Sequence, residues 1–373
     1  MRYFVLDAIP WPHLPDHDDA VGASSWVSCP NSQCEPSLST PLFESHLDVL
    51  AEVERLGFDG VCLPEHQQWP GGLTPAPLLL AAALARATKQ MKLAVISTAL
   101  ALGDPLRLAT ELATLDVLSG GRLVAGFTTG HDGDVFALQT DPTRCQERLR
   151  DGLDLVVRCW TTPGPWTWKT PSSFYRYVNP WPTPVQRPHP PLWVVDPGSP
   201  ATLQHLARHR ATFLTRRYQN AETSKLALEA FRAAGEQVNS PPTSDQVGWS
   251  VLVYVGASDA AARSEVEPHL RYLSERLLKN PPTAPGLEPV VNQLARLKNR
   301  RGLLGPGRTW DEIVTGGFAL VGGPATVRDR LNHWRRELGV GVVLLEFAIG
   351  SLPRERIRES LHRFASDVLP QVR

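Results

Sequence analysis

Short apolar segments alternate with longer segments of helical periodicity along this chain, which is typical of a parallel sheet with helices on its outer face. The predicted strands are Tyr3–Ile9, Gly60–Leu63, Lys92–Thr98, Leu123–Phe127, Leu192–Val195, Thr212–Thr215, Trp249–Val255 and Val342–Phe347. Eight strands that alternate with helices predict an α/β fold in which the sheet closes into a (β/α)8 TIM barrel.

Amphipathic periodicity, with proline and glycine at the ends, marks the helices between these strands. The predicted helices are Leu42–Leu56, Pro77–Ala87, Pro105–Leu118, Thr143–Trp160, Pro200–His209, Ala221–Ala234, Asp259–Leu278, Leu287–Arg300, Ala325–Leu338 and Arg354–Asp367. The helix that starts at Pro105 has the clearest beginning, because Asp104 suits the N-cap position and proline suits the first helical position.

Two long segments interrupt the alternation without dividing the chain. The first is a polar, Pro- and Ser-rich loop over 10–41, and the second is an insertion over 161–191, between the fourth predicted helix and the fifth strand. The aromatic residues of the insertion either pack it onto the barrel or form a lid over a binding site. Since no linker and no internal repeat is present, we predict one domain over 1–373.

Composition narrows the class of protein. Lys plus Arg and Asp plus Glu both number 38, so the net charge gives no sign of a nucleic-acid or anionic-membrane partner. No apolar run approaches the roughly 18 residues that span a bilayer, and the apolar start of the chain is too short for a signal peptide. The five cysteines are irregularly spaced, which does not indicate a disulfide framework. We expect a cytoplasmic protein.

Active sites of parallel barrels lie at the carboxyl ends of the strands, and this rule selects three segments. Glu65 and His66 follow the second strand, where an imidazole suits proton transfer. Thr128–Asp132 follows the fourth strand and contains Gly130, which would let a ligand approach the backbone. Asp196–Thr202 follows the fifth strand and opens a helix, so its N–H groups suit a phosphate or simply a cap at Ser199.

Other conspicuous residues favour a structural role. The turn Leu118–Arg122 precedes a strand, so it lies on the floor of the barrel, where we expect Arg122 to pair with Asp116. Cys29 and Cys34 lack a second pair of ligands, and we predict no metal site. Gly322 and Gly323 precede a helix without dinucleotide-binding spacing or a preceding strand.

The sequence resembles the luciferase-like (bacterial luciferase type) flavin-dependent monooxygenase superfamily. The resemblance is carried by Gly57–His66 (GFDGVCLPEH), Asp104–Gly130 (DPLRLATELATLDVLSGGRLVAGFTTG), Tyr177–Val195, Gly198–Arg210 and Gly323–Leu331. It implies a TIM barrel and a two-component oxidoreductase. A separate reductase would supply FMNH2, and oxygen would add at flavin C4a to give the (hydro)peroxide that oxidises a small or medium organic substrate.

The resemblance also implies roles for individual residues. His66, with Glu65, would be catalytic and lie near the flavin. The residues that would bind the cofactor are Ser97, Thr98, Ala99, Thr128, Thr129, Gly130, Arg144, Gly198, Ser199 and Thr202. Among these, Ser97–Ala99 would lie beside the isoalloxazine with a non-prolyl cis peptide, and the turn at Gly198–Thr202 would hold the FMN phosphate.

The sequence departs from the family pattern where arginines usually reach the phosphate. Thr129 and Gln146 stand at those places, although Arg144 and Arg148 lie one helical step from Gln146, and Gln67 replaces a second histidine. Two alternatives therefore stay open. One is a deazaflavin-dependent oxidoreductase of the same fold. The other is a flavin-free relative that either binds a ligand or catalyses a proton-transfer or rearrangement step with His66, His131 and Asp132. The resemblance further implies a homodimer formed through the predicted helices Pro77–Ala87 and Pro105–Leu118, whose Ala- and Leu-rich faces are Leu78–Ala85 and Leu108–Leu115.

Overall fold

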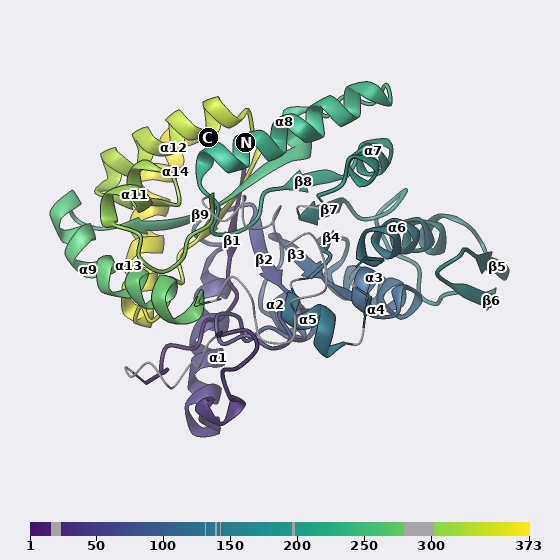
Figure 1. The fold of residues 1–373 in the computed structure, drawn as a ribbon, viewed down its shortest axis with the longest axis horizontal. Helices are drawn as coiled ribbons and strands as arrows, with labels where there is room; N and C mark the ends of the chain where they lie inside the picture. The colour runs from purple at the N-terminus through teal and green to yellow at the C-terminus, as the bar shows by residue number, and fades with distance from the viewer. Residues whose placement is uncertain (16–23, 131, 139, 142, 196–197, 280–301) are drawn as a thin grey trace.

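The computed structural model describes residues 1–15, 24–130, 132–138, 140–141, 143–195, 198–279 and 302–373. Eight parallel strands form a closed barrel in the order β1-β2-β3-β4-β7-β8-β9-β11, and β11 pairs with β1 to complete the ring (Figure 1). The strands are β1 (Arg2–Leu6), β2 (Gly60–Pro64), β3 (Lys92–Ser97), β4 (Leu123–Phe127), β7 (Leu192–Val195), β8 (Thr212–Leu214), β9 (Val247–Val255) and β11 (Val342–Glu346). The TIM-barrel prediction is confirmed.

A further strand, β10 (Ala319–Gly322), was not predicted from the sequence. The long strand β9 pairs with β8 at its first residues and with β10 from Leu252 to Val255, so β10 continues the sheet where β8 has ended. The expectation that no strand precedes Gly322 and Gly323 is therefore wrong. The two glycines join β10 to the following helix.

Helices surround the barrel (Figure 1). Their bounds are α1 (Pro36–Glu52), α2 (Pro77–Ala87), α3 (Ala99–Leu102), α4 (Pro105–Ser119), α5 (Asp132–Ala137), α6 (Cys145–Thr161), α7 (Pro200–Arg208), α8 (Ala221–Gln237), α9 (Asp259–Tyr272), α11 (Trp310–Thr315), α12 (Pro324–Leu338), α13 (Arg354–Arg363) and α14 (Leu369–Val372). Short π-helical segments extend α9 over Leu273–Leu277 and α13 over Phe364–Val368. The predicted helix Leu287–Arg300 lies outside the described residues.

Helix α1 starts earlier than the predicted Leu42. The carboxylate of Glu35 accepts a hydrogen bond from the Ser37 amide, and Pro36 occupies the first helical position. A capped start with proline at that position favours helix formation. The first predicted loop consequently ends at Glu35 instead of continuing to 41.

The insertion contains a β-hairpin at its centre. Strands β5 (Trp166–Lys169) and β6 (Phe174–Val178) pair antiparallel and lie apart from the barrel, at the right of Figure 1. The Arg158 guanidinium of α6 lies 4.4 Å from the centre of the Trp166 ring, which is a cation–π distance. This contact attaches the hairpin to α6.

Alternation along the strands separates two apolar layers. The side chains that fill the barrel interior are Phe4, Leu6, Cys62, Ala94, Ile96, Val124, Trp193, Leu214, Val342 and Leu344. The outward-facing residues pack against the helices in a larger cluster. Most of the Leu108–Leu115 face, which we expected in a dimer interface, is buried in that cluster within the chain. Leu79, Val117 and Leu118 are the exposed large apolar residues of α2 and α4.

The floor of the barrel carries Arg122, but not in the predicted pair with Asp116. The Arg122 guanidinium donates to the carbonyls of Ala85, Thr88, Met91 and Ser119 and to the Thr88 hydroxyl. Asp116 instead accepts from the amides of Val185 and Gln186 and from the Gln186 side chain. Both side chains are structural, as their position before a strand predicts, although each joins a different segment.

The described residues contain no helix that is both long and apolar enough to cross a membrane.

Candidate active site

A carboxylate organises the ends of β2 and β3. Glu65 follows β2, and its two oxygens accept from the Ser97 hydroxyl at 2.6 Å, the Thr98 hydroxyl at 2.6 Å and the Thr98 amide at 3.0 Å. The side-chain amide of Gln67 donates to the same carboxylate through Nε2, at 2.8 Å. Four donors leave little acceptor capacity for a substrate. Glu65 therefore holds the loop after β3 in place.

This arrangement changes the interpretation of the Ser97–Ala99 segment. The hydroxyls of Ser97 and Thr98 and the Thr98 amide all donate to Glu65, so these groups support the loop after β3 and are not available to a flavin. The cis peptide bonds of the described residues all precede prolines, at Pro165, Pro182 and Pro188. The cis peptide expected at Ser97–Ala99 is not among them. Ala99 begins α3, and its side chain lies outside the described part.

His66 contacts a cation that the sequence analysis did not select. The Arg217 guanidinium, which comes after β8, lies 3.0 Å from His66 Nε2. Because a guanidinium can only donate, Nε2 is the acceptor and the proton of the neutral imidazole is on Nδ1. Trp69 packs edge-on against the imidazole, with ring centres 4.9 Å apart. The side chain is thus fixed in orientation and tautomer while remaining partly exposed.

Arg217 in turn forms a nearly buried ion pair with Glu346, the last residue of β11. Nε donates to one carboxylate oxygen at 3.0 Å and Nη2 donates to the other, and the side chains are 12% and 5% exposed. Burial alone would lower the pKa of Arg217, but Glu346 and Tyr218 raise it above its usual range. Arg217 therefore keeps its positive charge beside Glu346, as an arginine does throughout the ordinary pH range.

Tyr218 completes this network. Its hydroxyl donates to Glu346 at 3.0 Å and accepts from Arg217, and its backbone has a φ of +61°. Burial raises the pKa of the Tyr218 phenol well above its usual range. The neutral phenol and the ion pair connect the ends of β8 and β11 to His66 on β2.

Asp7 at the end of β1 and His46 on α1 form a second buried pair. His46 Nδ1 lies 2.6 Å from the Asp7 carboxylate, which also accepts from the Ile9 amide at 2.7 Å. The pair is buried. Polar side chains from β1, β2, β3, β8 and β11 thus gather at the carboxyl end of the barrel.

The turn that opens α7 has the features of a phosphate site. The Ser199 hydroxyl caps the helix by accepting from the Thr202 amide at 3.2 Å, and the Arg150 guanidinium donates to the Thr202 hydroxyl at 2.7 Å. Gly198 has a φ of +75°, and a Cβ at this position would meet only Gln146, at 3.9 Å. Open space, a helix N-terminus and a nearby cation together suit an anion.

Arg144, the arginine predicted for this role, lies elsewhere. Its half-exposed side chain pairs with Glu147 at 3.5 Å. Arg148 donates to the carbonyls of Ala101 and Gly103. The cation beside the turn is thus Arg150, one helical turn beyond Gln146 on the same face of α6.

The segment after β4 lies at the same end of the barrel. The Thr128 amide donates to the Ser97 carbonyl, and Thr128, Thr129 and Gly130 are partly exposed. A Cβ at Gly130 would lie 2.7 Å from Leu102, and the residue has a φ of +75°. The positive φ therefore favours glycine at this position, and the end of the Leu102 side chain leaves little room for a Cβ. His131 and the side chain of Asp132 lie outside the described part.

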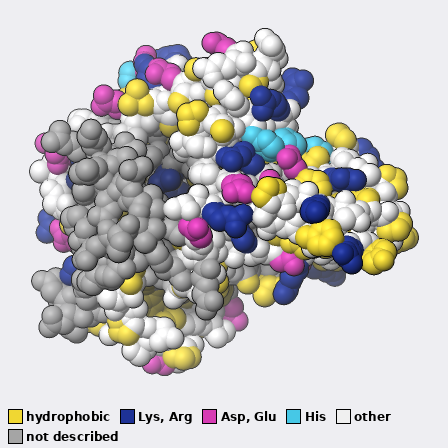
Figure 2. Space-filling model, turned by 45° about the vertical axis from the view of Figure 1, so that its right-hand side comes forward, with side chains coloured by type: hydrophobic (Ala, Val, Ile, Leu, Met, Phe, Trp, Pro, Cys, Tyr) yellow, Lys and Arg dark blue, Asp and Glu magenta, His cyan; other side chains and the backbone are white. Residues whose placement is uncertain are grey.

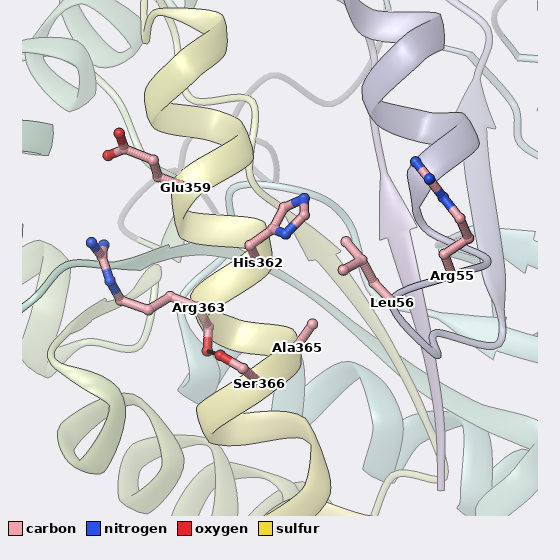
Figure 3. Close-up of a pocket in the computed structure, with 7 residues that line it drawn as sticks. All are labelled: Arg55, Leu56, Glu359, His362, Arg363, Ala365 and Ser366. Carbon is pink, nitrogen blue, oxygen red and sulfur yellow. Dashed lines mark hydrogen bonds between the residues drawn. The ribbon is translucent and has the colours of Figure 1, made fainter.

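A pocket of about 540 Å³ lies at a different place (Figure 3). Arg55 and Leu56 line one side, and residues of α13 and its extension line the other. Because the segment after α1 leads into β2, this pocket lies at the amino end of the strands. It is remote from the polar cluster at the carboxyl end, and we do not assign it to the active site.

The fold and the polar carboxyl end define a (β/α)8 barrel with a candidate anion site, and comparisons with known proteins identify its family. The model of the luciferase-like monooxygenase family matches residues 24–341. The chain belongs to this family. Its members include FMN-dependent monooxygenases and F420-dependent enzymes.

Two relatives illustrate the similarity in sequence. The chain is 24% identical to the uncharacterised protein y4wF of Sinorhizobium fredii, over 88% of this chain and 92% of that protein. It is 25% identical to the 4-hydroxyprotoasukamycin monooxygenase of Streptomyces nodosus subsp. asukaensis, over 87% and 85% of the two chains.

Solved structures show the same fold. The monooxygenase RslO1 of Streptomyces bottropensis is 22% identical with a TM-score of 0.75, and each chain is covered completely. The oxygenating constituent of 3,6-diketocamphane monooxygenase of Pseudomonas putida, in complex with FMN, is 17% identical over 100% and 99% of the chains, with a TM-score of 0.74. An F420-dependent secondary alcohol dehydrogenase is 16% identical over 89% and 95%, with a TM-score of 0.68.

Proposed function

We propose that this protein is the oxygenase component of a two-component, FMN-dependent monooxygenase that acts on a small or medium organic molecule. The observation that carries the proposal is Arg150, which lies beside the Ser199–Thr202 turn and supplies a cation close to the position where family members usually carry an arginine. A separate flavin reductase, present only transiently, is the partner that this reaction requires. A reductase partner is also consistent with the two-component relatives of the family.

The residues at the turn fit the terminal phosphate of FMN. Ser199 and Thr202 offer hydroxyl groups, the N-terminus of α7 offers the positive end of the helix dipole, and Arg150 offers a charge. Reduced FMN, when bound, supplies the electrons that activate oxygen for transfer of one atom to the substrate. We place the ring system of the flavin toward the backbone that follows β3, which Glu65 holds rigid.

His66 is the residue best placed to move a proton in this site. Arg217 fixes the proton on Nδ1, and Trp69 fixes the plane of the ring. Glu346 and Tyr218 keep Arg217 in position without contacting His66 themselves. We therefore assign proton transfer to His66 and a positioning role to Arg217.

Arg150→Met is expected to raise the Kd for FMN by about 10- to 100-fold, because a hydrogen bond to a charged group contributes roughly 1.5–3 kcal/mol. Fluorescence titration with oxidised FMN, and anaerobic titration with reduced FMN, measures this change. Arg144→Met is the matched control on the same helix, and its Kd should stay within about twofold of the wild-type value. Equal effects of the two substitutions would contradict the position that we assign to the phosphate.

His66→Ala is expected to slow oxygen-dependent turnover by about 10²-fold or more, the range of general acid–base catalysis. The Kd for FMN should change little, because His66 follows β2 and does not belong to the turn proposed for the phosphate. Stopped-flow reoxidation of the protein-bound reduced flavin by oxygen measures the rate.

His66→Gln separates proton transfer from the support of Arg217. The glutamine carbonyl can accept from Arg217 but cannot exchange a proton. We expect His66→Gln to be as slow as His66→Ala. A rate near that of the wild type would show that His66 acts only by holding Arg217.

A deazaflavin-dependent oxidoreductase is the second candidate, and the likeness in fold to the F420-dependent alcohol dehydrogenase favours it. The two functions differ in the cofactor that is bound, so parallel titrations with FMN and F420 decide between them. Binding of neither cofactor would leave the flavin-free alternative.

A further inference from the structure

Helices α6 and α7 are joined by a row of polar contacts outside the barrel. Residues Gln146, Arg150 and Asp154 are spaced four apart on α6 and therefore share one face. Gln146 contacts the Ser199 hydroxyl, and Arg150 donates to Thr202. The last member of the row, Asp154, faces two histidines of α7.

The two histidines meet the carboxylate through the same atom. Nε2 of His209 lies 2.6 Å from Asp154 Oδ1, and Nε2 of His205 lies 3.1 Å from the same oxygen. The imidazole centres are 4.8 Å apart. The pair is spaced i, i+4, which places both rings on one face of the helix.

We propose that Asp154, His205 and His209 bind a divalent transition-metal ion, of which Zn²⁺ is the natural candidate. The three ligand atoms lie within 4.8 Å of one another. In a tetrahedral zinc site with bonds of about 2.0–2.2 Å, neighbouring ligand atoms are separated by roughly 3.3 Å. Side-chain movements of less than about 1 Å therefore open the His–Asp contacts enough to admit the ion.

The hydrogen bonding around His205 also favours a metal. Its Nε2 is buried and has no hydrogen-bond partner of suitable geometry among the described residues, although it lies close to Asp154. A buried nitrogen without a partner is costly unless it is ligated. A metal would satisfy this nitrogen and keep the negative charge of Asp154 paired.

The cluster lies close to the surface of the protein. The side chains of His205, His209 and Asp154 are 18%, 23% and 38% exposed, so a water can serve as the fourth ligand once the ion is bound. In Figure 2, histidine side chains lie together at the surface on the side that comes forward.

Two nitrogens and one oxygen favour Zn²⁺, Co²⁺, Ni²⁺ or Cu²⁺ over Mg²⁺ and Ca²⁺, which prefer oxygen ligands. The ion would clamp α7 to α6 one helical turn from Thr202. The site rests on its own three residues and does not depend on the proposed function.

The test is a titration of the metal-free, full-length protein with Co²⁺, followed by the visible absorption bands of tetrahedral cobalt and by displacement with Zn²⁺. We expect one ion per chain, and no binding of Mg²⁺ at the same concentrations. His209→Ala and Asp154→Asn should each weaken Co²⁺ binding by about 100-fold or more, since loss of an outer-shell partner already costs about 10- to 100-fold. His333→Ala, an exposed histidine on α12, should bind like the wild type.

Thermal unfolding in the absence of metal checks that each variant is folded. Asp154→Asn is nearly isosteric, so it decides the outcome if His209→Ala does not fold. A wild-type protein that binds neither Co²⁺ nor Zn²⁺ would overturn the proposal, as would unchanged binding by Asp154→Asn.

Discussion

Arg217→Met is expected to lower the free energy of unfolding by about 3–5 kcal/mol, because it leaves the carboxylate of Glu346 buried without its partner. Glu346 is 5% exposed at the side chain and receives two hydrogen bonds from the guanidinium. Tyr218 is its remaining donor. Urea unfolding followed by circular dichroism measures the difference. Both proteins are fitted with the same dependence of the unfolding free energy on urea concentration.

The double substitution Arg217→Met with Glu346→Leu is the control for an unpaired charge. If the cost of Arg217→Met comes from the orphaned carboxylate, the double variant should recover most of the lost stability, since apolar replacement of both partners is often neutral. Two independent and additive losses would contradict this explanation. Arg217→Lys keeps the charge but loses the two-pronged contact, so we expect an intermediate loss.

The same ion pair links stability to function. Arg217 orients His66 and is itself oriented by Glu346. Two variants therefore separate the roles: Arg217→Met disturbs both the fold and His66, whereas His66→Gln keeps the ion pair intact. The ion pair of Arg217 and Glu346 thus holds His66 in one orientation before any substrate binds. Such preorganisation of polar groups is typical of active sites.

Most of the fold could be predicted, because strands of a parallel barrel are short apolar runs between clear turn signals. The bounds of Leu123–Phe127 and Pro77–Ala87 were correct to the residue. Strand β10 was missed, although Ala319–Val321 is also an apolar run that ends at a glycine. The hairpin of the insertion was missed because its strands are half exposed, so they lack a clear buried face.

The site could be predicted only in part. His66 and Glu65 follow an obvious strand, so the barrel rule places them at the mouth. The sequence does not show which of the adjacent residues Arg216 and Arg217 belongs to the site. In the structure, Arg216 is exposed, whereas Arg217 forms the ion pair with Glu346. Glu346 did carry a signal, since it is a charge at the end of the apolar run VVLLE.

Helix phase explains why Arg150, and not Arg144, lies beside the turn that opens α7. The resemblance implied a cofactor-binding role for Arg144, whereas contact with α7 requires the face of α6 that carries Gln146 and Arg150. The metal candidate was missed for a related reason. His205 and His209 have the i, i+4 spacing of a helical ligand pair, but the carboxylate that completes the set comes from α6.

Arg122→Met is expected to cost about 3–5 kcal/mol of stability with no change in cofactor affinity, because the loss of a buried hydrogen-bond network is among the most destabilising changes. Arg122 is 8% exposed, and its guanidinium binds four carbonyls and one hydroxyl that end α2, lead into β3 and end α4. Each of these bonds is made by a charged donor, and a single such bond contributes roughly 1.5–3 kcal/mol net of its exchange with water. Urea unfolding gives the stability, and FMN titration of the folded variant gives the affinity.

Arg86→Met is the matched control, because Arg86 is an exposed arginine on α2 beside one of the carbonyls that Arg122 binds. Its substitution should change stability by less than about 0.5 kcal/mol, as at most surface sites. Arg122→Lys keeps the charge, but an ammonium group cannot donate to all five acceptors of the guanidinium at once, so we expect it to lose more than half of the stability that Arg122→Met loses. A loss below about 1 kcal/mol for Arg122→Met would mean that water replaces the guanidinium, and the floor of the barrel would then not depend on this residue.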